Sequence, residues 1–264
     1  MNSKRFESAV FSFSYVFIFV MMQIAVLIVS VAFSSAFRGA SDLNDKDIYT
    51  VTAIADILSV FLLFIILRLR RQRIKDVTDL TAARFAPLAM AVIGGIAFSG
   101  ATNILLSVFT STPALQSYME TYAQQFSAMD LKNNLLIQGF CIWLLIPVCE
   151  EIVFRGFLFN ELKNLVRPKY AIIIQAFLFG LIHMNLIQGI YTFIIALFFG
   201  YAYQKTGKIL VPILMHVVFN IMGTSLGFIN NDNAVLIITL AGIPLTIVSM
   251  VYFMKAGRKA EESI

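Results

Sequence analysis

The stretch 135-LLIQGFCIWLLIPVCEEIVFRGFLF-159 decides the fold class, because it joins the length and apolarity of a membrane span to two adjacent acids, Glu150 and Glu151. A helix needs about 20 predominantly apolar residues to cross the hydrocarbon core of a bilayer. A charged side chain at that depth is costly, and it usually faces a protein interior or a water-filled cavity. The stretch therefore predicts a membrane-embedded helix that carries functional carboxyl groups.

The composition extends this conclusion to the whole chain. Of its 264 residues, 59% are hydrophobic and only 13% are charged, whereas a soluble domain carries roughly 25% charged residues. The net charge of +5 comes from basic residues clustered in the segments between apolar runs, so we expect no nucleic-acid surface. The apolar runs predict eight helical spans, near residues 9–36, 49–69, 85–109, 134–160, 170–185, 187–204, 209–229 and 234–254.

These spans predict an all-α, polytopic helical bundle that forms one membrane domain over residues 1–264. When the spans alternate across the bilayer, sixteen of the twenty basic residues fall on the side of the N-terminus. The positive-inside rule then places both termini in the cytoplasm. Within the domain we expect a protease-type core at residues 134–229, preceded by the N-terminal spans and an amphipathic outer segment at residues 1–133.

The outer segment, residues 110–133, has a helical pattern of its own. Apolar side chains recur there at steps of three and four residues, as on one face of a helix. We expect a short amphipathic helix on the outer surface. The residues of this face are Leu115, Tyr118, Met119, Tyr122, Phe126 and Met129.

The two adjacent acids have different expected roles. Arg155 follows Glu151 by four residues, the spacing at which helical side chains meet, so these two should form an ion pair within the helix. Neighbours on a helix point about 100° apart, which leaves Glu150 facing elsewhere. A carboxyl group in that position suits a general base.

The only two histidines of the chain, His183 and His216, lie in later apolar runs. Phe179 precedes His183 by four residues, and Asn220 follows His216 by four, which places each pair on one helix face. Counted from the expected cytoplasmic ends, these polar groups and Glu150 lie about 10–20 Å deep. Each alone has a structural reading, such as an interhelical hydrogen bond. Together they predict one converging site.

Three segments in this order resemble the motifs of the CPBP family, the CAAX-protease and bacteriocin-processing intramembrane proteases, also called the Abi family. The sequence EEIVFR at residues 150–155 resembles the EExxxR motif of that family. FGLIH at residues 179–183 resembles its FxxxH motif, and HVVFN at residues 216–220 resembles its HxxxN motif. The resemblance covers about residues 134–229.

The resemblance implies an intramembrane endopeptidase that hydrolyses a peptide bond of a membrane-associated protein or peptide. In the family the first glutamate activates water, the first histidine assists it, and the last two groups bind water, a metal or the developing oxyanion. The CAAX branch removes a C-terminal tripeptide after a prenylated cysteine, but nothing here indicates prenyl recognition. The implied roles are catalytic for Glu150, His183, His216 and Asn220, and supporting for Glu151 and Arg155.

Two mechanisms stay open. Catalytic zinc takes three protein ligands and leaves one position for water, and Glu150, His183 and His216 could supply those ligands for Zn²⁺. The chain has no HExxH pairing, however. In the metal-free alternative, Glu150 and His183 deprotonate a water, while His216 and Asn220 form an oxyanion hole. Both mechanisms require a water-filled cavity between the spans.

Two other functions compete with hydrolysis. The first is a non-enzymatic bacteriocin-immunity or membrane partner-binding protein of the same fold. The second is a proton-coupled transporter, since glutamate and histidine also form relays, although the internal repeats of many carriers are absent. The expected partners are membrane lipid and a membrane-associated peptide substrate, and the expected location is a bacterial plasma membrane.

Overall fold

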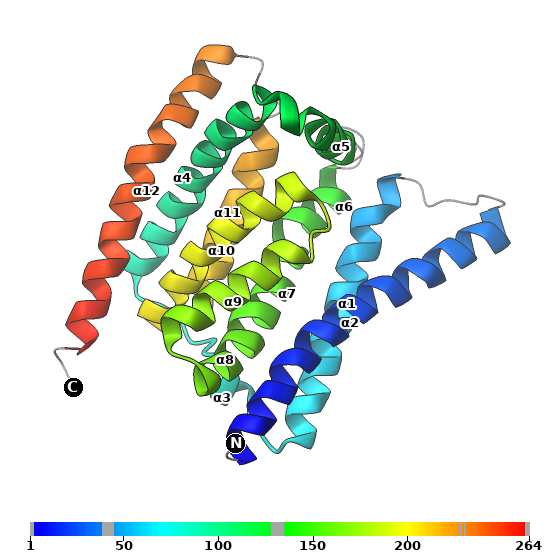
Figure 1. Cartoon of the computed structure of the whole chain (residues 1–264), viewed down its shortest axis with the longest axis vertical. Coiled ribbons are helices and arrows are strands. Elements are labelled where there is room, and N and C mark those ends of the chain that lie inside the picture. Colours follow the sequence, from blue (N-terminus) through cyan, green and yellow to red (C-terminus); the bar gives the residue numbers. More distant parts are fainter. Residues whose placement is uncertain (1–2, 39–44, 128–134, 227–228, 230, 262–264) are drawn as a thin grey trace. The chain divides into compact units, whose positions relative to one another are not determined.

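The structure, a computed structural model, describes residues 3–38, 45–127, 135–226, 229 and 231–261. All regular secondary structure in these residues is helical, which confirms the all-α fold class (Figure 1). Six of the described helices are long and apolar enough to span a bilayer, and two shorter apolar helices, Pro168–Leu181 and Leu210–Leu226, correspond to the fifth and seventh predicted spans. The count of eight crossings and the cytoplasmic placement of both termini stay predictions.

The chain divides into two compact units, which are described separately. Unit 1 comprises Met1–Thr78 and Ala123–Arg167, and unit 2 comprises Asp79–Tyr122 and Pro168–Ile264. The sequence analysis expected one membrane domain with a protease-type core at residues 134–229, and that assignment stays a prediction.

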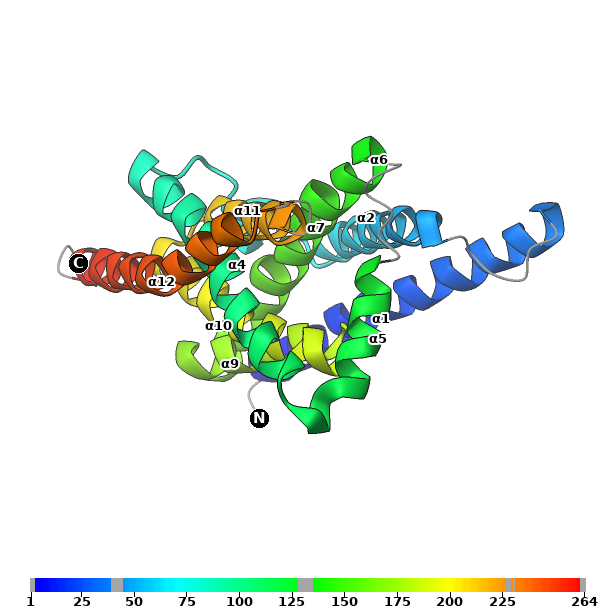
Figure 2. The same cartoon turned by 90° about the horizontal axis from the view of Figure 1, so that it is seen from above.

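Unit 1 is built on a pair of long helices and a segmented rod. Helix α1 runs beside α2 (Figures 1 and 2) and also packs against the rod, while α2 contacts the middle of the rod at α7. The rod matches the fourth predicted span and contains two wider π-helical turns, η2 and η3. The elements are α1 (Ser3–Arg38), α2 (Asp45–Leu69), α3 (Ile74–Val77), α6 (Leu135–Phe140), η2 (Cys141–Leu145), α7 (Ile146–Glu151), η3 (Ile152–Leu158) and α8 (Phe159–Leu165).

The first π turn has a local cause in the sequence. Pro147 lies at the start of α7 and has no N–H to donate to the carbonyl of Trp143, so the regular ladder of hydrogen bonds is interrupted there. The second π turn, η3, contains Arg155. Single π turns inside α-helices occur frequently at functional sites.

Unit 2 is a layer of helices held together by close backbone contacts. Helix α4 packs against both α11 and α12, and α9 packs against α10; Figure 1 shows α12 running alongside α4. The elements are α4 (Phe85–Thr110), η1 (Pro113–Leu115), α5 (Gln116–Ser127), α9 (Pro168–Leu181), α10 (Leu186–Thr206), α11 (Leu210–Leu226) and α12 (Asp232–Glu261). Helix α5 belongs to unit 2 as far as Tyr122, and its last residues belong to unit 1.

Glycine permits the closest of these contacts. A Cβ atom on Gly242 of α12 would lie 2.7 Å from the backbone nitrogen of Ala101 and 2.8 Å from the carbonyl oxygen of Ala97, both on α4. Small residues at such crossings are typical of helix packing in membranes, where close van der Waals contact replaces the hydrophobic driving force. Phenylalanines fill the space beside the crossing, with Phe98 and Phe198 ring centroids 4.5 Å apart.

The predicted outer helix is confirmed as α5. Met119 and Tyr122 are partly buried on one face while Tyr118 is exposed, and the ring of Tyr122 meets that of Tyr191 at 6.1 Å. Its location on the outer surface stays a prediction. Met129, at the end of the predicted face, lies outside the described residues.

The fifth predicted span, residues 170–185, is wrong at its C-terminal end. Helix α9 stops at Leu181, and Met184 adopts a left-handed conformation with φ of 52°. Asn185 then caps α10 by accepting a hydrogen bond from the backbone N–H of Gln188 at 3.1 Å. His183 therefore lies in the turn between α9 and α10 rather than within a helix.

Candidate active site

The predicted ion pair of the EExxxR segment is confirmed within unit 1. The guanidinium Nη1 of Arg155 donates to Oε1 of Glu151 at 2.8 Å, and both side chains are fully buried. Removing one partner from such a pair leaves an uncompensated charge in a low-dielectric interior. The pair thus fixes the turn between α7 and η3 and accounts structurally for one of the two adjacent acids.

Glu150, the other acid, is buried on α7 with 9% of its surface exposed. It interacts electrostatically with Asp56 as well as with the Glu151–Arg155 pair. Asp56 lies on α2, which packs against α7. Unit 1 therefore places a second carboxyl group beside the predicted general base.

Asp56 is a buried acid that the sequence analysis missed. It is fully buried, and its Oδ1 accepts a hydrogen bond from the side-chain amide of Gln23 on α1. The signal was present, because Asp56 lies inside the predicted span at residues 49–69 and an acid at membrane depth indicates function by the same argument that selected Glu150.

The two histidines are brought together within unit 2 by aromatic side chains. The ring of Phe179 on α9 lies 5.0 Å from the ring of His183 and 6.0 Å from that of His216, measured between centroids. Phe199 on α10 closes the other side of His216 at 5.5 Å. Phe179, which is nearly fully buried, thus packs against both imidazoles and fixes their spacing.

A backbone hydrogen bond sets the tautomer of His183. Its Nδ1 lies 2.8 Å from the carbonyl oxygen of Phe179. Because a carbonyl oxygen only accepts, Nδ1 carries the hydrogen and Nε2 presents a lone pair. An imidazole held in this way can take a proton from water or ligate a metal through Nε2.

Asn220 lies one turn after His216 on α11, as its spacing predicted, and its side chain is partly buried. Its backbone carbonyl accepts a hydrogen bond from the hydroxyl of Thr224 at 2.7 Å. The carboxamide can both donate and accept hydrogen bonds.

The predicted site residues divide between the units. Glu150 belongs to unit 1, whereas His183, His216 and Asn220 belong to unit 2. Within neither unit do the described residues gather three histidine, cysteine, aspartate or glutamate side chains into a metal-binding group. Unit 1 offers carboxyl oxygens and unit 2 offers imidazole nitrogens, so the predicted zinc ligands draw on both.

Comparison with known proteins bears on the same part of the chain. Residues 132–222 match the family model described as Type II CAAX prenyl endopeptidase Rce1-like, and this segment contains all three motifs. The family resemblance is confirmed. With its long apolar helices, the chain is an integral membrane protein similar to this family over about a third of its length.

Two curated bacterial proteins are also similar to this chain. The "UPF0177 protein YxdF" of Lactococcus lactis subsp. lactis (strain IL1403) is 25% identical over 137 residues, which is 51% of this chain and 74% of that protein. The "Putative membrane peptidase YdiL" of Bacillus subtilis (strain 168) is 31% identical over 74 residues, 28% of this chain and 30% of that protein. No solved structure matches the chain at a significant level.

Proposed function

We propose that this protein is an intramembrane endopeptidase that hydrolyses a peptide bond in a membrane-associated protein or peptide. The match of residues 132–222 to a CAAX endopeptidase model and the similarity to a protein named as a membrane peptidase support the proposal. The observation that carries it is the burial of Glu150 on α7, within the matched segment and next to the buried Glu151–Arg155 pair. A buried carboxyl group beside other charged groups at membrane depth is typical of a functional site.

In the proposed reaction Glu150 acts as the general base. Its carboxylate takes a proton from water, and the resulting hydroxide attacks the carbonyl carbon of the scissile amide. The carbonyl oxygen becomes an oxyanion as the tetrahedral intermediate forms. When the carbon–nitrogen bond breaks, Glu150 returns the proton to the departing nitrogen, so the products are a carboxylic acid and an amine.

The groups of unit 2 would support this reaction. His183 presents Nε2 as an acceptor for the attacking water, because its Nδ1 hydrogen is held by Phe179. His216 and Asn220 would donate hydrogen bonds to the oxyanion, where each preorganised donor lowers the barrier substantially. If the enzyme is metal-dependent, Glu150, His183 and His216 would hold Zn²⁺, which would supply a Lewis acid for the same carbonyl.

The proposed substrate is a membrane-associated peptide, and the proposed location is a bacterial plasma membrane. Both of these similar proteins are bacterial, and the positive-inside rule places the predicted site toward the cytoplasmic face. A prenylated substrate is suggested only by the name of the matching family model. The proposal therefore does not include a prenyl group on the substrate.

The test compares membrane proteomes of cells that lack the gene and express either the wild type or the Glu150→Gln variant. Mass spectrometry of new peptide termini should find cleavage products that the variant reduces by about 10²–10⁴-fold, the usual contribution of a general base. Glu120→Gln, which removes an exposed acid of α5, should cleave normally. Equal product from Glu150→Gln at equal membrane abundance would reject the enzyme.

A further inference from the structure

One end of unit 1 contains a polar pocket that plays no part in the proposed reaction. Its volume is about 330 Å³, within the roughly 300–1,000 Å³ typical of small-molecule sites. Three basic and two acidic side chains line it, for a formal net charge of +1. The charged lining residues are Lys4, Glu7, Arg70, Glu161 and Lys163.

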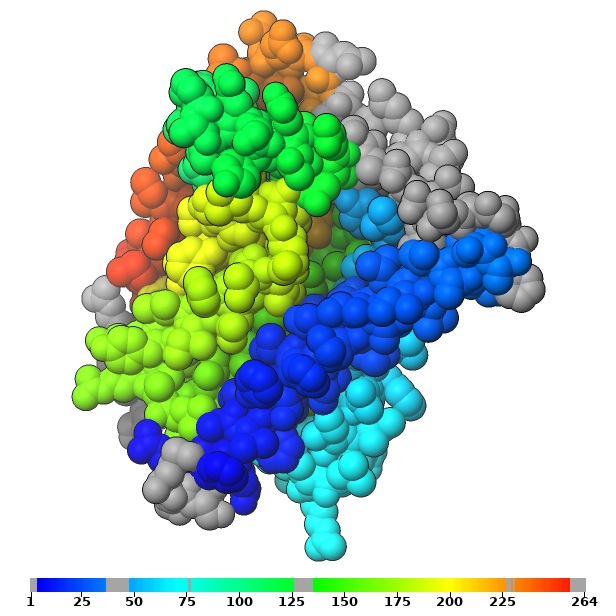
Figure 3. Space-filling model, turned by 45° about the vertical axis from the view of Figure 1, so that its right-hand side comes forward, coloured from blue at the N-terminus to red at the C-terminus, as the bar shows by residue number. Residues whose placement is uncertain are grey.

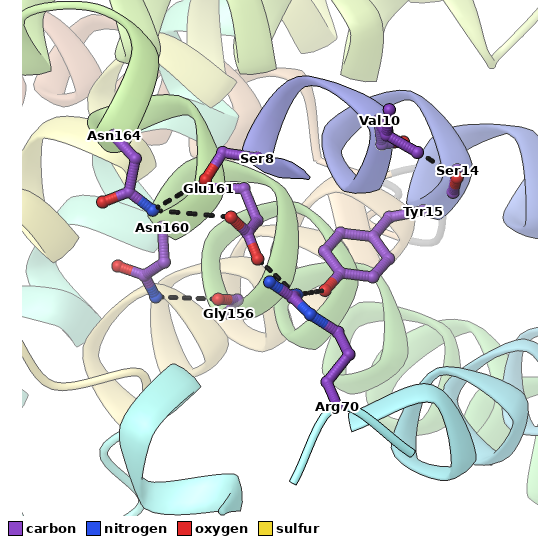
Figure 4. Close-up of polar contacts among 9 residues, drawn as sticks. All are labelled: Ser8, Val10, Ser14, Tyr15, Arg70, Gly156, Asn160, Glu161 and Asn164. Carbon is purple, nitrogen blue, oxygen red and sulfur yellow. Dashed lines mark hydrogen bonds and ion pairs between the residues drawn. The ribbon is translucent and has the colours of Figure 1, made fainter. Parts of the chain in front are cut away.

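The inner wall of the pocket is a fixed network (Figure 4). Arg70, at the end of α2, donates to Glu161 of α8 and to the hydroxyl of Tyr15 at 2.5 Å. The guanidinium carbon of Arg70 also lies 3.6 Å from the centre of the Phe11 ring. Asn164 donates to the hydroxyl of Ser8 at 3.2 Å. Because these groups already hold one another, the pocket is formed before any ligand arrives.

Two lysines that line this pocket take no part in that network. Neither Lys4 of α1 nor Lys163 of α8 forms an ion pair with another described residue, and both side chains are exposed. The Lys163 ammonium lies 5.1 Å from the centre of the Phe159 ring, while Glu161 is engaged by Arg70. A pocket with two available ammonium groups and a paired inner wall fits a singly charged anion.

The surroundings of the pocket indicate that the anion belongs to a lipid. The pocket lies where α1 begins and where α2 and α8 end, and α1 leaves it as an apolar span. Phe6, Val10, Phe13 and Phe17 recur along α1 and are 44–72% exposed. Figure 3 shows α1, in blue, at the surface of unit 1. The headgroup would occupy the pocket at the end of this span, while the acyl chains lie in the surrounding bilayer.

We propose that this pocket binds the headgroup phosphate of an anionic phospholipid, with Lys4 and Lys163 as its ligands. Basic pockets between transmembrane helices bind acidic headgroups on the cytoplasmic side of membranes, and the positive-inside rule assigns this end to that side. The site is separate from the proposed catalytic residues, so it does not depend on the enzyme proposal.

The test is native mass spectrometry of the purified full-length protein, titrated with phosphatidylglycerol, phosphatidylethanolamine or phosphatidylcholine. We expect phosphatidylglycerol to bind about tenfold more tightly than either zwitterionic lipid. Lys4→Ala and Lys163→Ala should each weaken that binding by roughly tenfold, because each removes a charge-assisted hydrogen bond. Equal affinity for the three lipids would overturn the proposal.

A matched control separates the pocket from general surface charge. Lys75 of α3 is an exposed lysine of the same unit that does not line the pocket, so Lys75→Ala should keep the wild-type affinity. A loss in Lys75→Ala as large as in the two pocket variants would overturn the proposal. Titration with millimolar sn-glycerol 3-phosphate distinguishes a lipid from a soluble ligand. If this soluble phosphate ester displaces phosphatidylglycerol, the proposal of a lipid is overturned. If it does not, the proposal of a lipid is supported. A thermal melt of each variant confirms that it is folded.

Discussion

The two units bury different kinds of groups. Every fully or nearly fully buried aspartate, glutamate or arginine among the described residues lies in unit 1, whereas the buried polar groups of unit 2 are amides, hydroxyls and an imidazole. Unit 2 instead relies on glycines at helix crossings and on phenylalanine rings. Unit 1 is thus organised to hold charge, and unit 2 to hold neutral side chains at fixed spacing. Mutations should therefore act through electrostatics in one unit and through steric fit in the other.

The largest effect is expected from breaking the buried ion pair of unit 1. Arg155→Met should lower the free energy of unfolding by about 3–5 kcal/mol, because it leaves the Glu151 carboxylate buried without its cation. Thermal or denaturant unfolding in detergent measures the loss. The double variant Glu151→Leu/Arg155→Met removes both charges and should recover much of it. A double variant less stable than Arg155→Met would contradict this account.

The matching experiment in unit 2 tests steric fit. Gly242→Ala should cost about 1–3 kcal/mol, as overpacking usually does, because the new methyl group would meet backbone atoms of α4 at 2.7–2.8 Å. Gly223 is the control, since the nearest atom to a Cβ there is the Ser99 hydroxyl oxygen at 3.9 Å. Gly223→Ala should be neutral or stabilising by up to about 1 kcal/mol, as is usual for glycine inside a helix. Equal melting temperatures of the two variants would count against the contrast.

A smaller electrostatic effect is expected at Asp56. Asp56→Ala should destabilise unit 1 by about 1–3 kcal/mol, since the partly buried amide of Gln23 loses its acceptor. Asp56→Asn keeps a carbonyl oxygen at that place and should cost less. Denaturant unfolding of the pair of variants measures the difference, and an Asn variant as unstable as the Ala variant would remove the hydrogen bond from the explanation.

The smallest effect concerns a surface pair in unit 2. Asp79 accepts a hydrogen bond from Lys208 at 2.5 Å, and the bonds from Lys208 and Thr81 lower the pKa of its carboxyl to about 2. The ionised form is favoured in the folded state, so its contribution is present above the ordinary carboxyl pKa of about 4 and is lost as pH falls through about 2.

For this partly exposed pair we expect no more than about 1 kcal/mol. Wild type and Asp79→Asn should therefore differ by a few degrees in melting temperature at pH 6 and converge as the pH approaches 2. A difference that grows with acidification would show that Asp79 contributes through something other than its charge.

Local periodicity explains which features could be predicted. The Glu151–Arg155 contact depends only on a spacing of four residues in a helix, and α5 depends only on a repeated apolar face. Both are confirmed. The apolar runs likewise correspond to the described apolar helices, because span length follows from bilayer thickness.

The features that were missed have both local and non-local causes. The end of α9 before His183 depends on the left-handed Met184 and the cap from Asn185, and apolarity alone carries no sign of either. The π turn of η3 contains no proline, the residue that accounts for η2. The position of Asp56 inside a predicted span could have been recognised from the sequence. Its proximity to Glu150 could not, because the two residues lie on helices that are distant in sequence.

The hydrogen bond from His183 to the Phe179 carbonyl makes the protonation of this ring measurable by NMR spectroscopy. The chain contains only two histidines, so nitrogen-15 labelling of histidine alone yields two ring signatures in an NMR spectrum. The anchored ring should show the chemical shifts of one protonated and one bare nitrogen at neutral pH. A bound inhibitor or cation would shift the resonance of the unprotonated Nε2 first. Ligand binding at His183 can therefore be followed without an engineered probe.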